Sequence, residues 1–206
     1  MILTLERRPE RSQWMSVLSP LLAVTLTAIV GAVIFSAQGI HPGRALYVYF
    51  IDPLTTPWSL EELAVKSSPL ILIGVGLAVC FKAKVWNIGA EGQLTAGALA
   101  GAAVPILLPT FQSLPVLAVM IVLAIAGGAL YGAIPALLKT RFGANEILTS
   151  LMLVYVAQLL LDWLVRGPWR DPNGFNFPQS AAFEGWQVLP HLGDGRLHLG
   201  IVFALV

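Results

Sequence analysis

The amino-acid sequence predicts an all-α polytopic membrane protein with five complete transmembrane helices and a truncated sixth. Of its 206 residues, 57% are hydrophobic and only 11% are charged. A soluble domain usually has about twice that charged fraction. The uncharged residues are also gathered in long blocks, and a membrane-spanning helix needs about 20 apolar residues. These blocks cover residues 12–43, 67–81, 92–138 and 147–161.

The first predicted span covers residues 15–35 and follows a charged tail at residues 1–14. Arginines before the apolar run are also typical of a cleavable signal peptide. The apolar core of a signal peptide, however, is only about 7–15 residues long. The longer run favours an uncleaved first span, and we expect an outer loop at about residues 38–59 after it.

The second predicted span covers residues 60–81, and the uncharged block at 92–138 predicts two more. Ser59 and Glu62 have the spacing of a capping box, which predicts a helix that begins at residue 60. The block at 92–138 is too long for one span, and prolines near its middle predict a turn within a helical hairpin. Glycines four residues apart on each arm allow helices to pack closely in a membrane. These glycines are Gly97 and Gly101 on the first arm and Gly128 and Gly132 on the second.

The fifth predicted span covers residues 146–165, with Asn145 as the expected N-cap. A polar segment at about residues 166–196 is predicted to form a second outer loop. Residues 197–206 begin another apolar run of fewer than about three turns, far short of a bilayer. We therefore expect a membrane domain at residues 15–206 that is incomplete at its C-terminal end.

The distribution of basic residues predicts that the N-terminus of this multi-pass membrane protein is cytoplasmic, because Lys and Arg concentrate in cytoplasmic loops. Seven of the 12 Lys and Arg residues fall in the tail and in the two short inner turns. They are Arg7, Arg8, Arg11, Lys82, Lys84, Lys139 and Arg141. Membrane lipid is thus an expected partner. The formal net charge of +1 and the dispersed basic residues argue against a nucleic-acid partner.

The sequence contains no motif for catalysis or metal binding. One cysteine, Cys80, and three widely separated histidines argue against a metal site. The phosphate-binding loop, the HExxH zinc motif and the GxSxG nucleophile motif are absent from the sequence. We therefore expect a chain that is not an enzyme and that contains no cofactor.

A polar cluster stands at the start of the third predicted span, where an apolar segment begins. Its members are Asn87, Gly89, Glu91, Gly92 and Gln93. A carboxylate that enters a membrane helix is costly and usually faces a protein interior, a cavity or water. Helix capping is the plainer interpretation, because Glu91 would interact favourably with the helix dipole and Asn87 could form the cap.

Two longer stretches contain sequence motifs that are more specific for a protein family than hydropathy alone is. Residues 69–101 have the sequence PLILIGVGLAVCFKAKVWNIGAEGQLTAGALAG, and residues 142–172 have the sequence FGANEILTSLMLVYVAQLLLDWLVRGPWRDP. These stretches resemble permease subunits of bacterial ABC importers, in the nucleoside and simple-sugar branch of the branched-chain-type permease family. The resemblance covers about residues 60–180.

The resemblance implies transport rather than catalysis by this chain, as a multi-pass protein of the bacterial plasma (inner) membrane. A second permease subunit would complete the solute path, and cytoplasmic ATP-binding subunits would use ATP to drive alternating access. A periplasmic or lipoprotein solute-binding protein would deliver the solute. The family's ATPase-docking segment lies beyond the last residue, so these 206 residues alone are not expected to transport. The polar cluster is expected to support an inner gate, with direct solute contact by Glu91 as the alternative.

The resemblance implies a nucleoside as solute, with ribose or another monosaccharide as the alternative. A membrane channel or assembly subunit without ATP coupling is a further alternative. Aromatic rings can stack on a base, and amides can bind ribose hydroxyls. The candidate residues are Tyr131, Tyr155, Gln158 and Asn145. Helix packing is the alternative role for the two tyrosines, and helix capping for Asn145.

Overall fold

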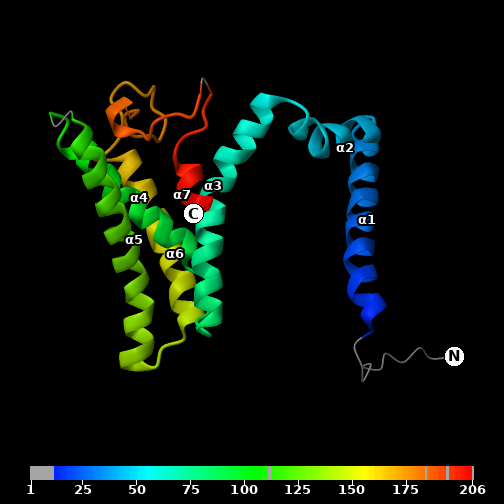
Figure 1. Ribbon diagram of the computed structural model, residues 1–206, viewed down its shortest axis with the longest axis horizontal. Helices are drawn as coiled ribbons and strands as arrows, with labels where there is room; N and C mark the ends of the chain where they lie inside the picture. Colours follow the sequence, from blue (N-terminus) through cyan, green and yellow to red (C-terminus); the bar gives the residue numbers. More distant parts are fainter. Residues whose placement is uncertain (1–11, 111–112, 184, 194, 206) are drawn as a thin grey trace. The chain divides into compact units, whose positions relative to one another are not determined.

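Figure 1 shows the computed structural model, and the residues that it describes are 12–110, 113–183, 185–193 and 195–205. Within these residues the regular elements are helices, apart from one isolated bridge between His191 and His198. The all-α fold class is therefore confirmed. The chain divides into two compact units after Leu63, within helix α3 (Pro57–Lys82).

The first unit contains α1 (Gln13–Ala37), α2 (Pro42–Phe50) and the 3-10 helix η1 (Asp52–Leu54). Helix α1 includes the whole of the predicted first span. Helix α2 lies in the segment predicted as an outer loop, and it begins with a proline, whose fixed φ suits the first turn of a helix. The predicted tail at residues 1–14 lies almost entirely outside the described residues.

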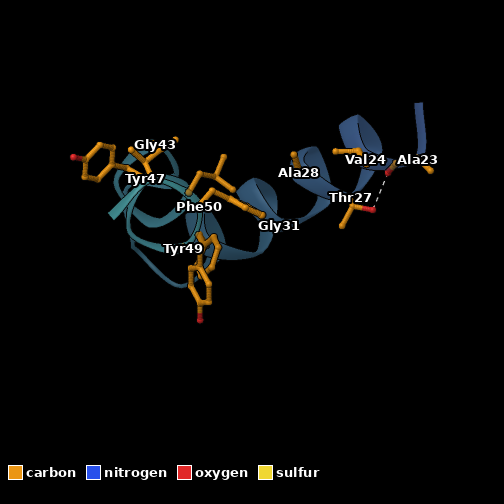
Figure 2. A pocket seen from close by; sticks show the side chains of 12 residues that line it. Ala23, Val24, Thr27, Ala28, Gly31, Gly43, Tyr47, Tyr49 and Phe50 are labelled. Atoms are coloured by element: carbon orange, nitrogen blue, oxygen red, sulfur yellow. Dashed lines mark hydrogen bonds between the residues drawn. The ribbon is translucent and has the colours of Figure 1, made fainter. Parts of the chain in front are cut away.

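An apolar groove of about 910 Å³ lies between α1 and α2 (Figure 2). Small residues of α1, such as Ala28 and Gly31, line it together with aromatic residues of α2. The ring centroids of Phe35 and Tyr49 are 5.9 Å apart, so aromatic packing holds α2 against the end of α1.

The prediction that Ser59 caps the second span is wrong. Helix α3 begins at Pro57, and Ser59 lies inside its first turn. The Ser59 amide donates to Thr56 Oγ1 at 3.2 Å, and the Leu60 amide donates to the Thr56 carbonyl at 3.1 Å. Thr56 is therefore in the N-cap position, followed by a proline that needs no amide partner.

The predicted helical hairpin is confirmed as α4 (Ala90–Leu107) and α5 (Leu114–Phe142), which lie side by side in Figure 1. A Cβ atom added to Gly97 would lie 2.7 Å from the Ala124 carbonyl oxygen, and one added to Gly101 would lie 2.9 Å from that of Met120. The two backbones are thus in direct contact, as the glycine spacing predicted.

Helix α6 (Glu146–Arg166) begins where the sequence predicted. The side-chain oxygen of Asn145 accepts from the amides of Ile147 at 2.9 Å and Leu148 at 3.4 Å, so Asn145 is its N-cap. Gly143 ends α5 in the left-handed region, with φ at +65°. This conformation favours glycine and turns the chain from α5 into α6.

Four helices of the described residues are long and apolar enough to cross a membrane, namely α1, α3, α5 and α6. The predicted count of five complete spans is not confirmed by length and hydropathy. Helix α4 has 18 residues but includes Glu91 and Gln93 in its first turn. The segment after α6 contains the 3-10 helix η2 (Gly185–Gln187) and the short helix α7 (Gly200–Leu205). Helix α7 lies at residues where the truncated sixth span was predicted.

Candidate functional site

The polar cluster lies where α4 begins, and its two glycines allow α4 to cross α6. Gly89 is the N-cap of α4 and is the last residue of a segment without regular secondary structure at residues 85–89, which we call the entry segment. A Cβ atom added to Gly89 would lie 2.8 Å from the Ser150 carbonyl oxygen. One added to Gly92 would lie 2.9 Å from Val154 Cα. Since these neighbours are backbone atoms of α6, only glycine fits at either position.

The side-chain amides of Asn87 and Gln93 bond to each other near this crossing. Asn87 Nδ2 donates to Gln93 Oε1 at 3.1 Å, and Gln93 Nε2 donates to Asn87 Oδ1 at 3.2 Å. The same Asn87 oxygen accepts from the Gly89 amide at 2.9 Å. The interpretation of Asn87 as the N-cap of α4 is therefore wrong, because Gly89 holds that position. Asn87 instead fixes the entry segment that leads into the helix.

Replacing Asn87 with alanine is expected to lower the free energy of unfolding by about 1–3 kcal/mol. The substitution leaves the Gln93 amide and the Gly89 N–H without their partner, and unsatisfied polar groups are costly once buried. Thermal unfolding of the detergent-solubilised protein measures the effect. The control is Gln13→Ala, which removes an exposed amide from the start of α1. Equal melting temperatures for both variants would contradict a structural role for the Asn87–Gln93 pair.

Ser150 joins the same crossing and was missed in the sequence. Only 2% of its surface is exposed. Its hydroxyl oxygen accepts from the Ile88 amide at 3.2 Å and donates to the Ile147 carbonyl at 3.2 Å. The first of these bonds satisfies a backbone amide of the entry segment before α4. A lone serine within an apolar helix gave no signal of this contact, because its partner is 62 residues away in the sequence.

The Glu91 side chain contacts α6 farther from the start of that helix than was expected from the position of Glu91 at the start of a span. Gln158 Nε2 donates to Glu91 Oε1 at 3.0 Å. Gln158 lies 12 residues after the first residue of α6, which corresponds to about 18 Å at 1.5 Å per residue. The carboxylate is thus bound near the middle of α6. This contact brings a member of the polar cluster together with a candidate solute-binding residue.

The other candidate solute-binding residues differ in how their polar atoms are used. The Tyr131 hydroxyl donates to the Leu153 carbonyl at 2.7 Å, and the Asn145 oxygen caps α6. Both groups therefore have structural partners. Tyr155 is 56% exposed, and it lies three residues before Gln158 on α6. Asn145, Tyr155 and Gln158 are the exposed candidates, and the binding role of all four candidates stays a prediction.

A cavity of about 450 Å³ lies beside the polar cluster, at the end of α5 and the start of α6. Asn87 and Gln93 line it together with Lys139 and Glu146. The Lys139 ammonium lies 2.5 Å from the Glu146 carboxylate, so an ion pair joins α5 to α6 across their short turn. In the described part of the chain, no group of three His, Cys, Asp or Glu side chains could hold a metal ion.

Residues 59–206 match the protein family described as the permease component of the branched-chain amino acid transport system. The chain belongs to this permease family. The match includes α3 to α7 and the whole polar cluster, so the resemblance seen in residues 69–101 and 142–172 is confirmed. The family is one of transport permease components, which is the class that the resemblance predicted.

Three relatives are named as ABC transporter permeases. The glucose ABC transporter permease protein TsgB13 of Haloferax volcanii is 42% identical over 192 residues, which are 92% of this chain. The nucleoside permease NupB of Lactococcus lactis is 31% identical over 68% of this chain. The guanosine permease NupP of Bacillus subtilis is 30% identical over 92% of this chain.

The permease sequence spans about half the length of these curated relatives, since the matched segments cover 50%, 38% and 55% of them. No solved structure matches it significantly.

Proposed function

We propose that this chain is part of the transmembrane permease subunit of an ATP-driven importer. The observation that supports this function best is the family match over residues 59–206, which contains the crossing of α4 and α6. The related permeases named above are all ABC transporter components. A second permease subunit, cytoplasmic ATP-binding subunits and a solute-binding protein are the partners that this function requires.

The proposed arrangement has five complete spans, a sixth that begins near α7, and a cytoplasmic N-terminus. Helix α4 is the additional span. Its 18 residues extend about 27 Å, close to the thickness of a hydrocarbon core. Packing against α5 and α6 shields its small residues from lipid. The basic residues beside the ends of α3 and α5 support an inner position for these two ends.

The proposed solute contains a sugar ring, as nucleosides and monosaccharides both do. Relatives of 31% and 30% identity support a nucleoside, because they are named for nucleoside and guanosine transport. The identity of 42% to a glucose permease supports a monosaccharide as the second candidate. Amide and carboxylate groups such as those of Gln158 and Glu91 suit the hydroxyl groups that both classes share.

Uptake of labelled guanosine, adenosine, ribose and glucose tests this function in cells that carry or lack the complete gene, with its neighbours intact. We expect gene-dependent uptake of at least one of these solutes, and loss of that uptake when the neighbouring ATPase is inactivated. Competition by unlabelled ribose or glucose separates the sugar class from the nucleoside class. Gene-dependent uptake that survives without the ATPase would favour a channel instead. Equal uptake of all four solutes with and without the gene would contradict the proposal.

A further inference from the structure

One face of α6 bears polar side chains between residues 155 and 162. Tyr155, Gln158 and Asp162 are spaced three and four residues apart, which places them on the same face of a helix. Glu91 of α4 joins them through its hydrogen bond to Gln158. We call these four residues the polar stripe. All four are exposed.

The polar stripe is separate from the face by which α6 packs. Ser150, Val154 and Ala157 are the buried residues of α6, and the first two meet the glycines at the start of α4. The stripe lies to one side of this packed face. It is therefore an open surface of the α4–α6 pair rather than part of its packed interface.

The charge of Glu91 indicates what covers the stripe. In the part of the chain that the structure describes, no Lys or Arg side chain forms an ion pair with Glu91, and its bond is to the neutral amide of Gln158. A carboxylate against lipid tails or in a dry helix interface would lose its hydration without a countercharge. Ionisable groups within membrane helices instead face protein interiors or water-filled cavities. Water therefore suits this surface better than lipid does.

We infer that the polar stripe lines a water-filled part of the solute path and that the Glu91–Gln158 pair binds the hydroxyl groups of a polyhydroxyl solute. The carboxylate accepts hydrogen bonds from two adjacent hydroxyls, while the amide both donates and accepts. Tyr155, one turn away on the same face, offers an aromatic surface beside them. This inference rests on the proposed permease function and assigns its solute contacts.

Cysteine accessibility tests the inference in the complete transporter. In a Cys80→Ala background, single cysteines replace Gln158, Asp162 or the control residue Val156. Val156 is 52% exposed at the same depth, but it lies off the stripe. A charged methanethiosulfonate reagent reacts with thiolates, which form in water rather than in lipid. It is added to both sides of membrane vesicles that contain all subunits.

We expect cysteines at 158 and 162 to react at least about ten times faster than the cysteine at 156. Saturating transported solute is expected to slow the reaction at 162 several-fold, because Glu91 and Gln158 are both intact in that variant and solute bound to them lies one turn away. Equally slow labelling at all three positions would overturn the stripe as a wet surface. Fast labelling at 162 that solute does not slow would overturn the binding site.

If the variant at 158 does not accumulate in the membrane, the variant at 162 still measures whether the polar stripe is accessible to water. The Asp162 carboxylate bonds to Arg166 one turn away on the exposed surface, so its loss leaves the helix crossing intact. Uptake by the unsubstituted transporter is measured in the same cells. Its absence would overturn the proposed function, whereas normal uptake with slow labelling would overturn only the present inference.

Discussion

Gly97→Val is expected to lower the stability of the permease by more than about 3 kcal/mol, and its melting temperature by roughly 6–12 °C. Even a single carbon at this position would lie 2.7 Å from the Ala124 carbonyl oxygen. Valine adds two further methyl groups, and the atom that it meets belongs to the backbone of α5. The hairpin can therefore accommodate the side chain only if its helices separate. Thermal unfolding of the solubilised protein, together with its level in the membrane, measures the loss.

Gly74→Val is the matched control, because Gly74 lies in an apolar helix and no atom stands within 4 Å of an added Cβ atom. The same change of residue type should shift its melting temperature by no more than about 2–4 °C, the equivalent of about 1 kcal/mol in a chain of this size. Similar losses for the two variants would show that close approach of α4 and α5 is not what Gly97 provides.

Local patterns in the sequence were sufficient to predict most of the helices. The turn near residue 110 follows from prolines inside an uncharged block, and the start of α6 follows from the capping preference of Asn145. The contact between α4 and α5 follows from glycines four residues apart. Each of these signals acts within a few turns of one helix or between neighbouring helices, and hence can be recognised without knowledge of the rest of the fold.

Two kinds of feature were not predicted from the sequence. In one, neighbouring residues suit the same structural position, and in the other, the contacting residues are far apart in the sequence. Ser59 and Thr56 both suit an N-cap, and the proline after Thr56 decides in its favour. Glu91 and Gln158 are 67 residues apart, so no local pattern joins them. Their pairing depends on how far α4 lies along α6. That depth is set by the glycine contacts at Ser150 and Val154, which only the folded chain reveals.

The double variant Glu91→Gln/Gln158→Glu exchanges the two residues of the Glu91–Gln158 pair. It is expected to restore the transport that each single substitution reduces. A hydrogen bond to a charged group contributes about 1.5–3 kcal/mol. Since about 1.4 kcal/mol corresponds to a tenfold change, Glu91→Gln and Gln158→Glu should each reduce uptake about 10- to 100-fold. The first removes the carboxylate that binds solute hydroxyls, and the second places two carboxylates together. The double variant again has one carboxylate and one amide at the site. Initial uptake rates at low solute concentration, corrected for protein level, measure the recovery.

Thr95→Val provides the control for this exchange, because Thr95 lies one turn after Glu91 on α4 and its hydroxyl donates only to the Glu91 carbonyl, at 2.9 Å. Its uptake should stay within about threefold of the unsubstituted permease, since a bond to a carbonyl of the same helix contributes little. A double variant that recovers to within about threefold of normal uptake, the margin allowed for the control, shows that the pair acts as a unit. If the losses of the two single variants simply multiply, each residue acts alone, because independent substitutions have additive free energies. Recovery of the melting temperature without recovery of uptake would instead mean that the pair only holds α4 against α6. The uptake and stability of the double variant together therefore separate solute binding from helix packing.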